Sequence, residues 1–108
     1  MAKKTDLLQG TLDLLILKTL ANGPLHGYGI AQRILITSKE LLQVQQGSLY
    51  PALHRLERKG LLKPEWRESG NGPMAKFYSL TPAGRACLRE EKEQWQRYAE
   101  AIAMVLES

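Results

Sequence analysis

Cysteine, histidine and long apolar runs are scarce in this 108-residue sequence, and each scarcity excludes a class of protein. The single cysteine, Cys87, excludes an internal disulfide framework and a cysteine-based zinc site. Together with His26 and His54 it offers too few ligands for a metal, so neither a metal nor a cofactor is expected. No apolar stretch reaches the roughly 18 residues of a membrane span. We therefore expect a soluble, cytoplasmic protein without a membrane partner.

The residue patterns of catalysis are also missing. The sequence has no Gly-x-Ser-x-Gly turn for a nucleophile, no glycine-rich phosphate loop and no convincing carboxylate pair. The carboxylates at 90, 91 and 93 alternate with Arg89 and Lys92, which is typical of a solvated helix face. An enzyme is therefore not expected. A dimer that binds a small molecule and does not bind DNA remains an alternative.

Positive charge is present, but it is unevenly distributed. The formal net charge is +4, of which residues 1–80 carry +5 and residues 81–108 carry −1. A surface for a polyanion therefore belongs to the first three-quarters of the chain, and the last quarter has another role.

Apolar periodicity predicts helices over 7–21, 26–36 and 48–59. The first helix is apolar on more than one side, which suggests that a partner subunit covers the second side. Ser48 is expected as the N-cap of the third helix, which puts Pro51 at its third position.

A change of pattern follows the third helix. Two short segments with β-favouring aromatics, 61–67 and 75–80, flank the turn-rich stretch 69–73, which predicts a β-hairpin. Thr81 as N-cap and Pro82 at the first position then open a helix that continues to residue 106.

This order of elements is typical of an α+β, mainly α fold: a winged helix–turn–helix with three helices, a β-hairpin wing and a long C-terminal dimerisation helix. We expect a DNA-binding unit over 1–80 and a dimerisation helix over 81–108, joined in one structural unit. Apolar residues recur at 3/4 spacing along the last helix, which suits packing on another helix. The positions expected at the seam of the homodimer are Leu8, Leu12, Leu15, Leu88, Trp95, Tyr98, Ala99 and Ile102.

The third helix has an apolar side and a polar side on a 100° wheel. The polar side presents Pro51, His54 and Arg58, flanked by Tyr50 and Arg55. Such a helix fits the DNA major groove, where these side chains can donate to base edges and phosphates. The alternative is a winged helix whose outward helix binds an acidic protein partner.

Five sequence blocks, over 26–30, 47–53, 55–57, 60–62 and 76–84, resemble the signature blocks of the PadR-like transcriptional regulators. Their residues read HGYGI, GSLYPAL, RLE, GLL and KFYSLTPAG, and the resemblance extends over residues 8–95, most closely to the short-tailed branch with a single C-terminal helix. It implies a dimeric repressor on a pseudo-palindromic double-stranded operator, released in many members by a small, often aromatic, effector.

The resemblance also implies roles for individual residues. The third helix would enter the major groove, the second helix and the N-terminus would touch phosphates, and the wing would reach an adjacent groove. Met74 and Ala75 stand where the family often has two basic residues, so Lys76 would act nearly alone on the wing. With the basic residues of the third helix included, the expected DNA-binding residues are Lys3, Lys4, Tyr28, Ser48, Tyr50, Pro51, His54, Arg55, Arg58, Asn71 and Lys76.

Two aromatic residues have a second interpretation. Tyr28 fits packing between the first helices as well as a phosphate contact. Trp95 fits the core of a dimer as well as the wall of a flat pocket for a planar aromatic effector.

Overall fold

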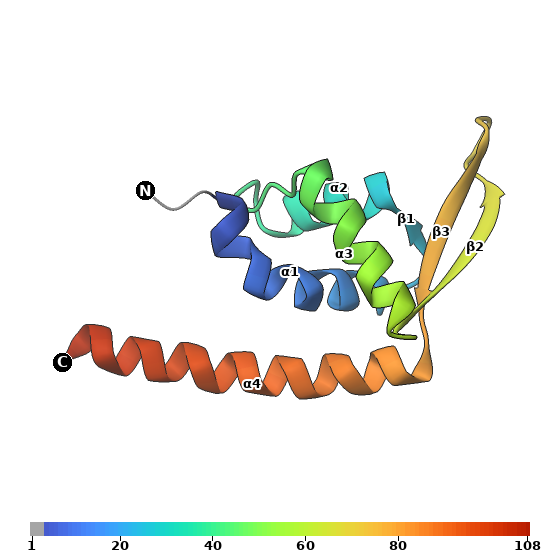
Figure 1. The fold of residues 1–108 in the computed structure, drawn as a ribbon. Helices are drawn as coiled ribbons and strands as arrows, with labels where there is room; N and C mark the ends of the chain where they lie inside the picture. The colour runs from blue at the N-terminus through green and yellow to red at the C-terminus, as the bar shows by residue number, and fades with distance from the viewer. Residues whose placement is uncertain (1–3) are drawn as a thin grey trace.

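The element order of the computed structural model is that of a winged helix–turn–helix with an added C-terminal helix (Figure 1). The structure describes the backbone of residues 4–108 and the side chains of residues 11–108. In chain order the elements are α1 (Lys4–Leu20), β1 (Leu25–His26), α2 (Gly27–Thr37), α3 (Gln46–Arg58), β2 (Leu62–Glu68), β3 (Met74–Leu80) and α4 (Pro82–Glu107). The expected fold class is therefore confirmed.

The three short helices enclose the core. Among the side chains of residues 11–108, twelve buried residues form one cluster, and its most deeply buried members come from α1, α2 and α3. These are Ile16, Leu17, Leu20, Ile30, Leu49, Leu53 and Leu56. Burial of such side chains contributes roughly 1.5–3 kcal/mol each to folding, so the three-helix cluster dominates the stability of the domain.

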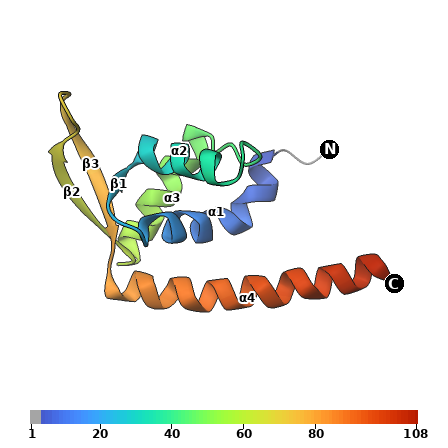
Figure 2. The same cartoon turned by 180° about the vertical axis from the view of Figure 1, so that it is seen from behind.

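The sheet has one strand more than the sequence predicted. Its order is β1-β3-β2 with both pairs antiparallel, and β1 pairs Leu25 with Tyr78 and His26 with Phe77. A strand of two residues is too short to show an alternating pattern, so periodicity could not reveal it. The β2–β3 hairpin is the expected wing, and it stands at the opposite end of the molecule from the C-terminus of α4 (Figures 1 and 2).

The start of α3 differs from the expectation. The helix begins at Gln46, and its N-cap Gln45 makes no side-chain capping hydrogen bond. Ser48 therefore lies inside the first turn and is not the cap. Pro51 becomes the sixth helical residue, and its missing N–H leaves the carbonyl of Gly47 without the usual helical donor.

The start of α4 agrees with the expectation. The Thr81 hydroxyl accepts from the backbone N–H of Gly84 at 3.0 Å and donates to the carbonyl of Gly60 at 2.7 Å. Gly84 is buried so tightly that a Cβ atom there would lie 2.2 Å from the carbonyl oxygen of Leu61. This contact fixes where α4 leaves the winged domain.

We expect Gly84→Ala to lower the free energy of unfolding by about 2 kcal/mol or more, because the added methyl group forces the backbone of residue 61 to move. Gly47→Ala is the matched control, since Gly47 is also helical and a Cβ there meets nothing within 4 Å. It should raise stability by about 0.5–1 kcal/mol. Urea unfolding measures both, and equal stability of the two variants would contradict the packing described.

Candidate nucleic-acid interface

Helix α3 presents two opposite faces. Its apolar back is buried through Leu49, Ala52, Leu53 and Leu56. Its front exposes Tyr50, Pro51, His54 and Arg58, while Ser48 is half-buried in the first turn. The structure thus brings together most of the residues expected to read bases, and burial of the back fixes the direction in which they project.

Arg55, which flanks this front, forms an ion pair within the protein. Its guanidinium Nη2 donates to Asp13 Oδ1 of α1 at 2.8 Å, and both side chains are partly exposed. The ion pair ties α3 to α1 and engages the Arg55 charge. In the free protein Arg55 is therefore held against α1, while 44% of its side chain stays exposed.

The beginning of α2 lies beside the front of α3. His26 caps α2, because its Nδ1 accepts from the backbone N–H of Gly29 at 3.0 Å. Tyr28 is 62% exposed and its hydroxyl accepts from the amide of Gln32, so the packed alternative for this ring does not hold. The Tyr50 ring covers Gly27, where a Cβ would lie 2.8 Å from it. Glycine at this position therefore allows α2 and α3 to approach closely.

The wing contributes less free charge than expected. Asn71 is exposed in the turn between the strands. Lys76, however, places its Nζ 3.1 Å from Glu57 Oε1 of α3, and its hydrogen bond to Glu57 raises the pKa of Lys76 above the usual lysine value. Lys76 therefore joins the wing to α3 and remains charged at neutral pH.

A cleft of 540 Å³ separates α3 from the wing. We call it the α3–wing cleft, and the residues that line it are His26, Gly27, Tyr28, Tyr50, His54, Trp66, Ser69, Ala75, Lys76 and Tyr78. Trp66 was not among the expected site residues. The strand alternation could have indicated it, because Trp66 pairs directly with Lys76 and such cross-strand partners share a face of the sheet.

The expected seam divides into two parts. Leu12 is in the core of the protomer, and Leu15 and Leu88 pack against that core, so these three side chains are satisfied within one chain. Helix α4 of the same chain packs along α1, so it covers part of the second apolar side of α1 (Figure 1). Lys3 lies outside the described residues, as do the side chains of Lys4 and Leu8.

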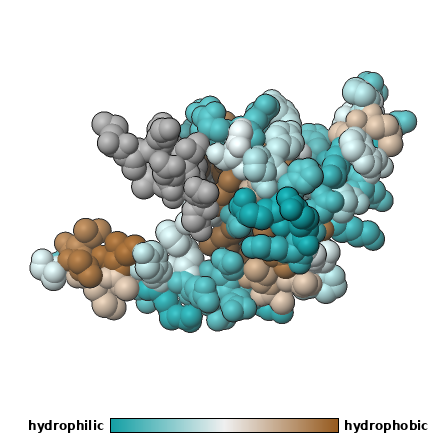
Figure 3. All heavy atoms as spheres, viewed as in Figure 1, coloured by the Kyte–Doolittle hydropathy of each residue, from teal (hydrophilic) through white to brown (hydrophobic). Residues whose placement is uncertain are grey.

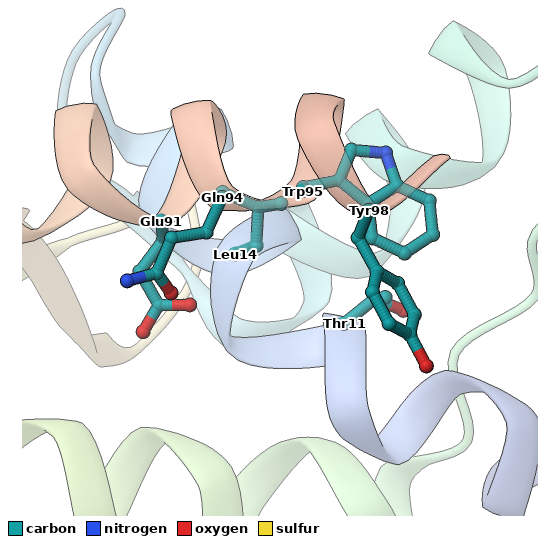
Figure 4. A pocket seen from close by; sticks show the side chains of 6 residues that line it. All are labelled: Thr11, Leu14, Glu91, Gln94, Trp95 and Tyr98. Atoms are coloured by element: carbon teal, nitrogen blue, oxygen red, sulfur yellow. The ribbon is translucent and has the colours of Figure 1, made fainter. Parts of the chain in front are cut away.

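The second part of the seam lies toward the C-terminus of α4. Trp95, Tyr98 and Ile102 are exposed by 43%, 63% and 42%, and Ala99 between them is half-buried. Trp95 and Tyr98 stand beside Thr11 and Leu14 of α1 at a pocket of 230 Å³ (Figure 4). Their ring centroids are 6.4 Å apart.

The described residues show neither a metal-binding group nor an ionised thiol. Among the described residues no group of three or more His, Cys, Asp and Glu side chains could hold a metal ion. Burial raises the pKa of the Cys87 thiol, which keeps it protonated at neutral pH. Within the described part of the chain, no helix has the length and apolar character to cross a bilayer.

Comparison with known proteins gives consistent relatives. The sequence pattern described as the transcriptional regulator PadR-like family matches residues 16–90. A transcriptional regulator of Mycobacterium tuberculosis is 38% identical over 87 residues, which cover 81% of this chain and 78% of that protein. An uncharacterized protein of Lysinibacillus sphaericus is 29% identical over 104 residues, covering 96% of this chain and 95% of the other.

Solved structures agree over nearly the whole length. A transcriptional regulator from Clostridium thermocellum has a TM-score of 0.82 at 31% identity, covering 90% of this chain and 94% of that chain. A PadR family transcriptional regulator from Eggerthella lenta has a TM-score of 0.81 at 32% identity, covering 95% and 88%. The family pattern spans the end of α1, helices α2 and α3, the wing and the start of α4. The chain therefore belongs to the PadR-like family of transcriptional regulators.

Proposed function

We propose that this regulator is a homodimeric, sequence-specific DNA-binding repressor. Residues 1–80 would bind DNA and residues 81–108 would hold the dimer together. The observation that carries the proposal is the front of α3, where Tyr50, Pro51, His54 and Arg58 project from a helix whose back is buried. An exposed, donor-rich helix of this kind fits the major groove.

The two α3 helices of a dimer would contact two half-sites of a pseudo-palindrome. Half-site centres are then expected about 34–36 Å apart, or a multiple of that, as in other dimeric helix–turn–helix proteins. Footprinting on the DNA upstream of the protein's own gene tests this spacing. A gel shift at physiological salt with specific and random duplexes separates DNA binding from the alternative of an acidic protein partner.

His54→Ala should reduce the preference for operator over single-base variants by about tenfold at the base it reads, because one base contact contributes roughly 1–3 kcal/mol of discrimination. Arg58→Ala is the control at the end of the same helix. We expect it to weaken binding to all duplexes alike and to lower the logarithmic salt slope by about 0.9, as for one lost phosphate contact. Competition binding measures both variants, and a uniform loss from His54→Ala would contradict the base-reading role.

The dimer proposal is supported by the end of α4. Large apolar side chains remain exposed there, and the space-filling view shows them gathered at this end (Figure 3). Ala101, Ile102, Val105 and Leu106 line one hollow with an apolar surface. Exposed apolar patches on a small domain mark interaction sites, and a second copy of α4 offers the same patch in return.

Ile102→Glu should shift the protein from dimer to monomer, because the dimer interface would have to bury a carboxylate that has no partner. Operator binding should then weaken at least tenfold. The control is Glu100→Lys, a charge change on the opposite side of α4 by the 100° spacing. Sedimentation velocity at micromolar concentration reads the outcome. A dimeric Ile102→Glu protein would refute the assigned seam.

The effector proposal concerns the pocket at Trp95. The Trp95 and Tyr98 rings, with Leu14 opposite, offer flat apolar surfaces, while Glu91 and Gln94 offer polar ends. A small planar aromatic compound matches these surfaces, and its binding between α1 and α4 would alter how the protomers are held and so release DNA.

Planar aromatic compounds should quench the fluorescence of Trp95 in a Trp66→Phe background, which removes the signal of the other tryptophan. The same titration on Trp95→Phe with Trp66 intact is the control and should show no such quenching. If no compound in a panel of flavins and phenolic dyes quenches Trp95 in a saturable manner, the effector proposal is wrong. The proposal of operator binding would stand in that case.

A further inference from the structure

Trp66, in the α3–wing cleft, has no role in the functions described so far. We propose that Trp66 is the apolar platform on which a deoxyribose of bound duplex DNA packs. This inference rests on the proposed DNA binding and adds a site and a contacting residue to it.

The position of the cleft leads to a DNA strand as its occupant. In the proposed docking, α3 lies in the major groove. A sugar–phosphate backbone borders this groove on each side, so a surface that stands directly beside α3 meets one of these backbones. The 540 Å³ cleft is the space between α3 and the wing.

The ion pair between wing and helix fixes which side of the sheet faces this strand. Lys76 of β3 reaches Glu57 of α3 at 3.1 Å, so the face of the sheet that carries Lys76 is the one turned toward α3. Trp66 is the direct partner of Lys76 in the antiparallel register, so the two side chains share a face of the sheet. Tyr78, two residues after Lys76 on β3, lies on the same face. Trp66 therefore lines the cleft instead of the outer surface of the wing.

The exposure of Trp66 calls for a partner. Trp66 is 63% exposed, more than Trp95 at 43%, although its neighbour Lys76 is held in an ion pair with Glu57. Most of this large aromatic surface therefore faces solvent in the free protein. It can contact a sugar ring or an unstacked base without selecting a sequence.

The chemistry of the lining suits a phosphodiester. None of the ten lining residues is acidic. The hydroxyl groups of Tyr28 and Tyr50 can donate hydrogen bonds, and the Trp66 indole N–H is a donor only. Phosphate oxygens are acceptors, whereas the deoxyribose carbons beside them offer an apolar surface to Trp66.

The experiment uses the full chain with Trp95→Phe, so that Trp66 is the only tryptophan. The probe is a duplex of about 30 base pairs selected from a random pool by the unmodified protein, long enough for two half-sites. We expect saturable quenching of Trp66 on adding this duplex. A protein with Trp66→Phe and Trp95 intact is the reciprocal control and should change much less.

Affinity provides the second readout, measured relative to the Trp95→Phe protein. Adding Trp66→Ala should weaken binding about tenfold on operator and random duplex alike, in line with the loss of one stacking contact, and Trp66→Phe should retain most of the affinity. The salt slope should be unchanged in both, because Trp66 carries no charge. A merely structural role would instead lower the thermal midpoint, which the exposure of Trp66 leads us to expect unchanged.

The outcomes are separable. If the selected duplex binds but Trp66 does not respond and Trp66→Ala binds equally well, the cleft assignment fails while the DNA-binding function stands. If the salt slope falls by about one unit in Trp66→Ala, the change acts on charged groups and the platform role is refuted. If selection enriches no duplex at all, the DNA-binding function fails and this inference fails with it.

Discussion

Burial of the apolar back of α3 is the constraint from which the rest of the molecule follows. Leu49, Leu53 and Leu56 are almost entirely removed from solvent, and they leave α3 only one orientation in the core. Rotating the helix by even one residue would expose one of these side chains and bury His54 or Arg58, at a cost of several kcal/mol. The direction of the outward face is therefore set by hydrophobic burial and not by the outward residues themselves.

Two ion pairs extend this constraint to neighbouring elements. Asp13 and Arg55 join α1 to α3, and Glu57 and Lys76 join α3 to the wing. Each contributes little to stability at a partly exposed position, about 0–1 kcal/mol. They mark where these elements meet, and the Glu57–Lys76 pair lies where α3 meets the wing. Two cations expected from the sequence to act on DNA are thus engaged within the protein.

The sequence predicted the elements better than their contacts. Helices and hairpin were found from periodicity and turn residues, and Thr81 was assigned correctly as a cap. The start of α3 was missed because Ser48 offers a stronger capping signal than Gln45, although the backbone continues the helix past it. The partners of Arg55 and Lys76 come from residues 42 and 19 positions away, a separation that no local pattern reveals. The apolar second side of α1 indicated a further packing partner, and α4 of the same chain covers part of it, a contact that the pattern alone does not identify.

The tight contact between Gly84 and the Leu61 carbonyl makes the junction of α4 with the winged domain rigid. Beyond this junction, the remainder of α4 to Glu107 extends for about 35 Å at 1.5 Å per residue. A lever of that length converts a tilt of about 5° into a displacement of about 3 Å at its far end, close to the rise of one base pair. In the proposed dimer, a small change in the angle between the two α4 helices would therefore alter the distance between the two α3 helices by about the spacing of one base pair.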